Sequence, residues 1–221
     1  MNSLVSCRAR GFTLIELLIT LAVTVVLLTI GLPGMQSFYD RERLISATEQ
    51  IYSHIQQARI ESIARSRGVY VKFEVDGNNL IYGISQQAGC DLAVDGNTTP
   101  VSLTNNACVL IVDSGDGDAS SSMDIADLTS LNDLVLMRFD LDEYQGNISA
   151  ISASKPEIVF DHLRGVPYEV DGGLPVKISP EIEVSITSKL DRELTLKIAS
   201  LGQVKICSSG TVPVVGYSDC E

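Results

Sequence analysis

The stretch Arg8-Ala-Arg-Gly-Phe-Thr-Leu-Ile-Glu-Leu-Leu18 decides how the whole chain is organised. It opens an apolar run of 21 residues, 12–32, in which Glu16 is the single ionisable side chain. About 20 apolar residues suffice for a helix to cross a bilayer. Arg8 and Arg10 stand directly before the run and predict that the short N-terminus stays on the cytoplasmic side. The run therefore predicts a membrane helix, belonging to either a secretory signal or a plain membrane anchor.

The details of the run fit neither interpretation well. A secretory signal has an apolar region of about 7–15 residues with a small-residue cleavage site after it. Here the run is longer, and its notable small residue, Gly11, comes before it. Glu16 is also unusual, because a carboxylate in hydrocarbon is costly and generally has a partner. Either it lies close enough to the interface for its side chain to reach water, or it pairs with a buried cation.

The motif around the junction offers a third interpretation. Gly11-Phe12-Thr-Leu-Ile-Glu16-Leu, behind a short basic leader, resembles the processing motif of type IV pilins and pseudopilins. The resemblance implies that a prepilin peptidase cleaves after Gly11, so that residues 1–11 are a leader, and that Phe12 becomes an N-methylated first residue. It also implies that Glu16 pairs with the new amino terminus of a neighbouring subunit and sets the register of assembly. The expected location is the inner membrane, crossed once, with a periplasmic C-terminal domain.

The charge of the chain limits its partners. The formal net charge is −12, and loss of the leader with its two arginines leaves 14 basic against 28 acidic side chains. Nonspecific nucleic-acid binding depends on Lys and Arg that displace counterions from phosphates. So acidic a protein is not expected to bind DNA nonspecifically or to adhere to an anionic membrane surface.

Four cysteines lie beyond the apolar run, while Cys7 belongs to the leader. An even number in an exported domain predicts disulfides. Three pairings are possible, and the favoured one joins Cys90 to Cys108 and Cys207 to Cys220 because it closes the shortest loops. A metal site is the alternative, but the CxxC spacing of such sites is missing, so no metal and no cofactor are expected.

A single helix of about 55 residues is predicted from the apolar run onward. Its first half, 12–34, is the membrane and assembly half, and Pro33 is expected to kink it. In the second half, 35–68, apolar residues recur every three or four positions and predict one buried face. These residues are Leu44, Ala47, Ile51, Ile55 and Ala58. The helix is expected to end near Ser66 or Arg67, with Gly68 as its stop signal.

Beyond the helix, residues 69–221 are predicted to form a β-rich globular domain. The apolar period changes to two, beginning with a hairpin of 69–75 and 80–84 joined by the four-residue loop 76–79. Further short strands are expected at 109–112, 134–139, 147–151, 157–160, 175–178, 182–187, 193–198 and 203–207. Short strands separated by turn residues favour two antiparallel sheets over a parallel α/β fold. The predicted class is therefore α+β and pilin-like, with the long helix packed on two antiparallel sheets.

Two segments between the strands are predicted to be loops. Residues 86–108 are polar and hold two of the cysteines, and 113–130 are rich in Asp, Ser and Gly. The aspartates of 113–127 raise a calcium alternative. An EF-hand loop has Gly at its sixth position and Glu at its twelfth, whereas a loop that starts at Asp116 would have Ser121 and Asp127 at these positions. A solvated acidic loop is therefore the favoured interpretation.

Two C-terminal segments narrow the resemblance to the GspH/FimT-type minor pseudopilins. They are 158–165, a strand ending in Phe160 before a Gly165 turn, and 196–207, a final hairpin turning at Gly202. Membership would imply a minor subunit that initiates or caps a type IV pilus, or alternatively a minor pseudopilin of a type II secretion system. Some FimT-like members bind DNA in natural transformation through tail arginines. The tail here, 208–221, has no Lys or Arg, so a FimT-like DNA-binding role, the second alternative, is not favoured.

No enzyme is expected. The chain has two histidines, His54 on the predicted helix and His162 in a predicted turn, and both have ordinary structural explanations. Motifs for a nucleophile elbow, a phosphate-binding loop or a dinucleotide site do not occur. The expected partners are other pilin subunits, the prepilin peptidase and the inner membrane.

Overall fold

The computed structural model describes residues 12–112, 131, 133–178 and 181–220, with side chains for all of them except 30–34. By internal contacts the chain divides into two units, Met1–Tyr39 and Asp40–Glu221. Helix α1 (Leu14–Ala64) contributes to both. Among the residues that the structure describes, no helix reaches the length and hydropathy needed to cross a membrane, so the expected membrane-spanning half stays a prediction.

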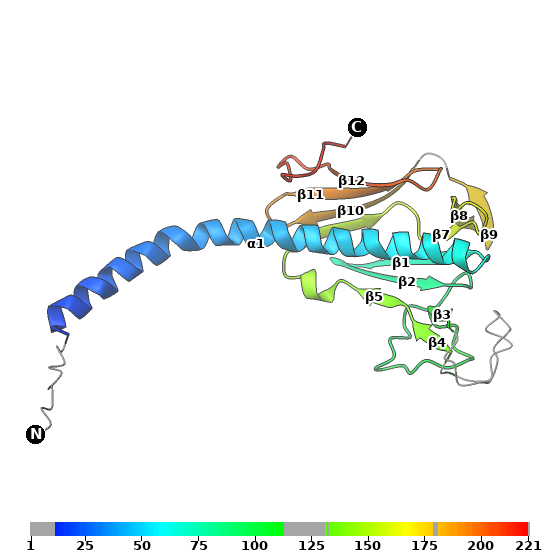
Figure 1. Cartoon of the computed structure of the whole chain (residues 1–221), viewed down its shortest axis with the longest axis horizontal. Coiled ribbons are helices and arrows are strands. Elements are labelled where there is room, and N and C mark those ends of the chain that lie inside the picture. The colour runs from blue at the N-terminus through cyan, green and yellow to red at the C-terminus, as the bar shows by residue number, and fades with distance from the viewer. Residues whose placement is uncertain (1–11, 113–130, 132, 179–180, 221) are drawn as a thin grey trace, which may run out of the picture. The chain divides into compact units, whose positions relative to one another are not determined.

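The part of α1 within the second unit packs its apolar face into the core of the domain (Figure 1). Leu44 is 2% exposed, and Ala47, Ile51, Ile55 and Ala58 are fully buried, as the spacing of these residues predicts. Burying one such aliphatic side chain contributes about 1.5–3 kcal/mol. This stripe, more than local helix propensity, holds the helix on the sheets.

The end of α1 differs from the prediction. Ser66 has a positive φ of 53°, its N–H donates to the Ile63 carbonyl, and the Arg67 N–H donates to the Ser62 carbonyl, each over 3.2 Å. This is the hydrogen-bond pattern of a Schellman cap, with Ser66 in the left-handed position that Gly68 was expected to supply. Gly68 has a packing role instead, because a Cβ there would lie 3.3 Å from Val159 Cγ2.

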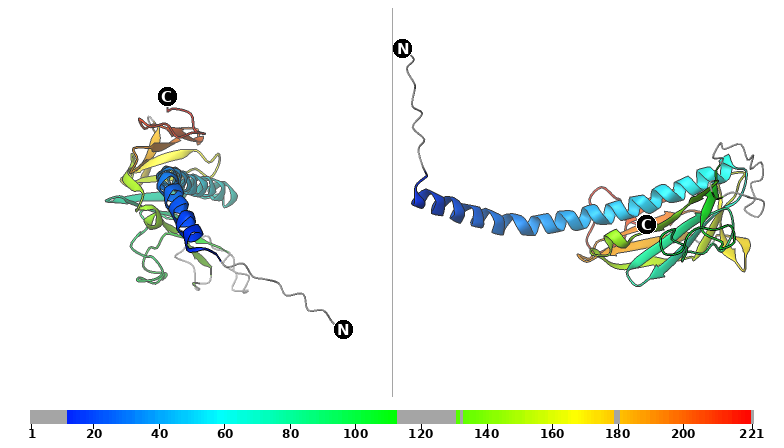
Figure 2. Two further views of the ribbon diagram at one scale, coloured as in Figure 1. Left: turned by 90° about the vertical axis from the view of Figure 1, so that its left-hand side faces the viewer. Right: turned by 90° about the horizontal axis from the view of Figure 1, so that it is seen from below.

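The strands form two larger antiparallel sheets, as predicted, and one small sheet that was not. The six-stranded sheet has the order β5-β2-β1-β7-β8-β9, the four-stranded sheet β12-β11-β10-β6, and the small sheet pairs β3 with β4. The strands are β1 (Val69–Asp76), β2 (Asn79–Ser85), β3 (Val109–Ile111), β4 (Leu134–Leu136), β5 (Arg138–Asp140), β6 (Ile148–Ala153), β7 (Glu157–Phe160), β8 (Pro167–Asp171), β9 (Leu174–Lys177), β10 (Ile182–Ser188), β11 (Glu193–Ile198) and β12 (Val204–Ser208). A short 3-10 helix, η2 (Asp142–Tyr144), follows β5. Figure 2 shows the domain from two further directions.

Three strand predictions were wrong in detail. Residues 134–139 are not one strand, because the chain passes from the small sheet to the six-stranded sheet at buried Met137. Strand β8 was missed, since a proline at its start is typical of a turn as well as of the first residue of a strand. The β1–β2 loop is shorter than expected, because Asp76 and Asn79 already pair across the hairpin.

Two disulfides tie the connections to the sheets. Cys90 is bonded to Cys108 and Cys207 to Cys220, which is the pairing favoured from the sequence. The first disulfide packs directly on Gly83 of β2, where a Cβ would lie 2.5 Å from Cys108 Sγ. A side chain at position 83 would therefore push the disulfide away from the sheet.

Candidate assembly site at the start of the helix

The first turn of α1 is stabilised by its own side chains. Thr13 precedes the helix, and the Glu16 backbone N–H donates to Thr13 Oγ1 over 3.3 Å. Thr followed three residues later by Glu is the sequence of a capping box, in which both residues satisfy free N–H groups of the first turn. A carboxylate in this turn also interacts favourably with the positive end of the helix dipole. The Thr13 hydroxyl therefore caps the start of α1.

The apolar side chains that follow have no partner in the described chain. Large hydrophobic side chains of this half are 50–78% exposed: Leu14, Ile15, Leu17, Leu18, Ile19, Leu21, Val23, Val25, Val26, Leu27 and Leu28. A continuous apolar surface of this extent marks a site of contact with other proteins or with lipid.

The threonines in this half do not make its surface polar. The hydroxyls of Thr20, Thr24 and Thr29 donate to backbone carbonyls one turn earlier, over 2.9, 2.7 and 2.8 Å. A hydroxyl that bonds back to its own helix leaves no unsatisfied donor facing outward. The surface is thus suited to hydrocarbon or to the apolar faces of other helices.

The structure describes Phe12 and Glu16 among the predicted assembly residues, but not Gly11 or the side chain of Pro33. Phe12 is 83% exposed, and Glu16 is exposed in the first turn. Gly11 lies outside the described residues. α1 is a single helix through position 33, and since the Pro33 side chain is not among those described, the kink stays a prediction.

A buried ion pair, missed by the sequence reasoning, fixes the helix to the domain. Asp40 is 3% exposed, and its Oδ2 accepts from Ser188 Oγ over 2.8 Å and from Arg192 Nη1 over 3.1 Å. Ser188 and Arg192 flank the turn between β10 and β11. Breaking a buried pair is strongly destabilising, so this contact joins the helix mechanically to the four-stranded sheet.

The C-terminal disulfide loop packs against the helix. Tyr217 Oη donates to Glu49 Oε1 over 2.8 Å, Arg41 Nη2 donates to the Val215 carbonyl over 2.8 Å, and Val214 is buried. Partial burial and the hydrogen bond to Glu49 raise the pKa of Tyr217 to about 12. Val215 keeps 76% of its surface exposed, so the tip of the loop stays accessible.

A second helix–sheet contact involves Arg59 and two glycine turns. Arg59 Nη1 donates to the Gly202 carbonyl over 2.8 Å. A Cβ on Gly165 would lie 2.8 Å from Arg59 Cγ, and a Cβ on Gly202 would lie 2.6 Å from the Gly165 carbonyl oxygen. Both glycines also have positive φ, 61° and 80°. The two turns singled out in the sequence therefore touch each other, and Arg59 fills the space beneath them.

The histidines have structural surroundings. His54 Nδ1 lies 2.7 Å from Tyr82 Oη, and its ring stacks on Phe139 with centroids 3.6 Å apart. Burial lowers the pKa of His54, which favours the neutral ring. His162 lies in the turn after β7, with Nδ1 3.6 Å from Asp161 Oδ1. His54 is therefore a packed histidine of the helix and His162 a turn histidine, and both have ordinary structural surroundings.

Metal binding has little support in the described part of the chain. There, no group of three or more His, Cys, Asp or Glu side chains is arranged to hold an ion. The calcium candidate, residues 113–127, lies outside the described residues. The calcium alternative therefore stays untested.

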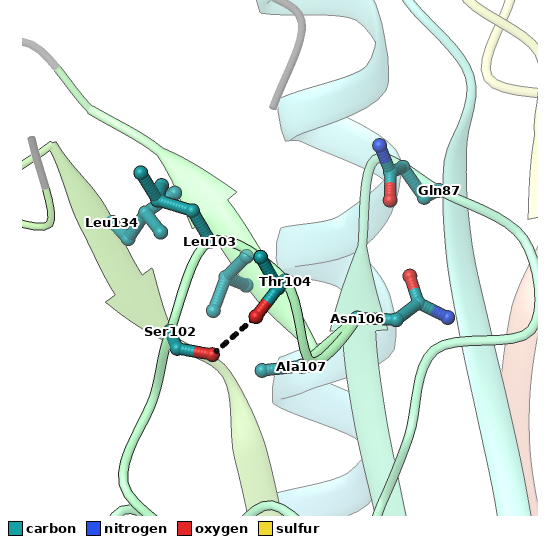
Figure 3. Close-up of a pocket in the computed structure, with 8 residues that line it drawn as sticks. Gln87, Ser102, Leu103, Thr104, Asn106, Ala107 and Leu134 are labelled. Carbon is teal, nitrogen blue, oxygen red and sulfur yellow. Dashed lines mark hydrogen bonds between the residues drawn. The ribbon is translucent and has the colours of Figure 1, made fainter. Parts of the chain in front are cut away.

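A small hollow beside the β3–β4 sheet has a volume of about 200 Å³ (Figure 3). It is lined by Gln87, Ser102, Leu103, Thr104, Asn106, Ala107, Val109 and Leu134. The hydroxyls of Ser102 and Thr104 lie 3.3 Å apart at its edge. Its lining side chains are uncharged, and those of Gln87, Ser102, Thr104 and Asn106 carry its polar groups.

The start of the helix matches a known sequence motif. A capped helix with one carboxylate in its first turn, followed by a long exposed apolar surface, is the arrangement expected of a type IV pilin-like protein. Residues 6–32 match the family model described as the prokaryotic N-terminal methylation motif. The chain therefore carries the class III leader. Comparison with curated proteins and with solved structures gave no match.

Proposed function

We propose that this chain is a minor pilin, a structural subunit that initiates or caps assembly of a type IV pilus. The observation that carries the proposal is the leader motif followed by the exposed apolar half of α1. A surface of that kind is stable only when covered, first by the inner membrane and later by the helices of neighbouring subunits. Its length of 21 apolar residues in 12–32 supports insertion before assembly.

In this proposal Glu16 has two successive roles. Before cleavage its carboxylate lies in the first turn of α1, where it interacts favourably with the positive end of the helix dipole. After cleavage the amino group of Phe12 is a free cation, and in the filament Glu16 pairs with the amino group of a neighbouring subunit. Pairing both charges in an apolar bundle avoids the cost of burying either one alone.

The domain is compatible with more than one assembly role. The two glycine turns at 158–165 and 196–207, on which the GspH/FimT resemblance rests, meet in space through Gly165 and Gly202. This arrangement places Arg59 of α1 against both turns. It does not separate a pilus subunit from a minor pseudopilin of type II secretion, which is the alternative function. In the parent cell, loss of the gene should abolish pili in the first case and secretion of folded proteins in the second.

A DNA-binding role is the second alternative and has less support. The tail from 208 onward has no Lys or Arg, and it is held against α1 by Tyr217 and Val215. A gel-shift titration with the detergent-solubilised full chain tests this role. Binding that weakens steeply with added salt would favour it.

Processing tests the proposal directly. Membranes that contain the chain and a prepilin peptidase should yield a product starting at Phe12, methylated at its amino group, as measured by mass spectrometry. Gly11→Leu should leave the chain at full length, because the residue before the cleaved bond is enlarged. Gly31→Leu is the matched control within the apolar run and should be processed normally. Cleavage at any other bond, or none in the natural sequence, would contradict the proposal.

A further inference from the structure

The two glycine turns border a groove that the assembly role does not use. We call it the turn groove; its volume is about 460 Å³. It is lined by Asp161, Leu163, Arg164, Val166, Pro167, Tyr168, Lys177, Ser200 and Leu201. These residues come from the turn after β7, from β8 and β9, and from the turn between β11 and β12. Both large sheets therefore contribute to one surface.

The edges of the turn groove are unusually apolar for an exposed turn. Leu163 is 74% exposed and Leu201 is 73% exposed, each at the tip of its own turn. The tips are held close together because Gly202 approaches the Gly165 carbonyl so tightly that a Cβ would clash. Two exposed leucines held side by side by a constrained backbone form a preorganised apolar contact rather than a random surface feature.

The turn groove also carries positive charge within an acidic protein. Arg164 and Lys177 are exposed, and neither forms an ion pair with the residues that the structure describes. Beneath the turns, Arg59 donates to a backbone carbonyl and likewise pairs with no described carboxylate. Asp161 is engaged by the N–H groups of Leu163 and Arg164, over 3.1 and 3.3 Å. The local charge therefore favours an anionic group, against a net charge of −12 for the whole chain.

The turn groove continues onto the outer face of the six-stranded sheet. A second hollow of about 320 Å³ shares Asp161 and Tyr168 with it and includes Tyr70, Val159 and Pro175. Tyr70, Val159 and Tyr168 are paired in register across β1, β7 and β8, so the two tyrosines stand on either side of a short valine. Adjacent strands lie about 4.8 Å apart, which places the two tyrosine backbones about 10 Å apart on either side of Val159.

We propose that the turn groove binds an extended segment of another protein that presents apolar side chains together with one or two carboxylates. The leucine edges and the tyrosine pair would receive the apolar side chains, while Arg164 and Lys177 would pair with the carboxylates. A nucleic acid fits less well, because a phosphate backbone needs many cations and gains little from leucine edges. A surface of this kind lets the subunit recruit a partner through its domain while α1 is occupied in the filament.

Peptide binding to the purified full chain in detergent tests this inference, with fluorescence anisotropy as the readout. The probe is the labelled peptide acetyl-Phe-Ser-Leu-Asp-Leu-Ser-amide, and the comparison is the same peptide with Lys in place of Asp. The aspartate peptide should bind at least about tenfold more tightly than the lysine peptide, since the charge contacts reverse sign. Because no filament is involved, the result is independent of whether the chain is a pilin.

Matched variants locate the binding. Arg164→Glu with Lys177→Glu should weaken the aspartate peptide about tenfold or more and improve the lysine peptide. Leu163→Ser with Leu201→Ser should weaken both peptides, because the apolar area buried on binding is lost. Lys189→Glu and Val215→Ser, an exposed cation and an exposed apolar residue elsewhere, should leave both affinities unchanged. Equal binding of the two peptides, or binding of an oligonucleotide but of neither peptide, would overturn the proposal.

Discussion

Within the single helix α1, similar aliphatic residues have opposite surroundings in the two units of the chain. In residues 14–28 the large aliphatic side chains are at least half exposed, whereas Leu44, Ile51 and Ile55 are no more than 2% exposed. The buried side chains recur every three or four positions and match a sheet surface, while the exposed ones surround the helix. An exposed aliphatic surface of this extent is typical of a site that contacts lipid or another protein. The difference therefore divides one element into a folding half, which is buried in the domain, and an exposed half, which we propose is the assembly half.

The largest expected effect comes from the ion pair where the folding half begins. Asp40→Ala should lower the free energy of unfolding of the domain by about 3–5 kcal/mol, because a largely buried arginine loses its carboxylate contact. Urea unfolding of the full chain in detergent, followed by circular dichroism, measures the change. Glu42→Ala is the control: its pair with Arg41 is well exposed, so about 0–1 kcal/mol is expected. Equal effects of the two substitutions would mean that Asp40 does not anchor the helix.

A matched pair of isoleucine substitutions tests the two halves directly. Ile51→Ala should lower the free energy of unfolding by about 2–5 kcal/mol, since it leaves a cavity in the core. Ile19→Ala removes the same atoms from a side chain that is 58% exposed and should leave domain unfolding unchanged. The same urea titration measures both. A loss of domain stability from Ile19→Ala would break the distinction between the halves.

A smaller effect, of opposite sign, is expected at the end of the folding half. Ser66→Gly should stabilise the domain by about 1 kcal/mol, because glycine adopts the positive φ of this cap without the strain of a Cβ. Ser53→Gly, at an exposed position inside α1, should destabilise it by about 0.5–1 kcal/mol. Thermal unfolding midpoints of the two variants should therefore move in opposite directions from the natural protein. A lower midpoint for Ser66→Gly would show that the cap is not strained.

The features predictable from sequence are those that depend on near neighbours in the chain. The leader motif, the stripe from Leu44 to Ala58 and most of the strands follow from local spacing, and the two short disulfide loops follow from loop length. The contacts that connect elements could not be foreseen in this way. Asp40 meets Arg192 across 152 residues, and Arg59 meets Gly202 across 143. Such charges are typical of solvated surface positions in a sequence, and only the tertiary fold brings each one to its partner.

The local errors also have physical causes. The Schellman pattern at the end of α1 places Ser66, two residues before Gly68, in the left-handed position, while Gly68 packs closely on Val159. Glu16 stands three residues after Thr13, which is also the spacing of a capping box. Its role as a helix cap is equally consistent with its position. Charge pairing with an amino terminus needs the carboxylate of Glu16, whereas a capping box needs only a hydrogen-bond acceptor, so substitutions can distinguish the two roles.

Incorporation of Glu16 variants into filaments tests the central claim most directly. Glu16→Gln keeps a side chain that can complete the capping box but lacks the charge, whereas Glu16→Ala lacks both. If Glu16 pairs with the amino terminus of a neighbouring subunit, both variants should be cleaved after Gly11 yet be at least about tenfold depleted from sheared filaments, measured by quantitative immunoblotting. Glu74→Gln, an exposed carboxylate of β1, should be incorporated normally. Normal incorporation of Glu16→Gln would contradict charge pairing and leave Glu16 as a helix cap alone.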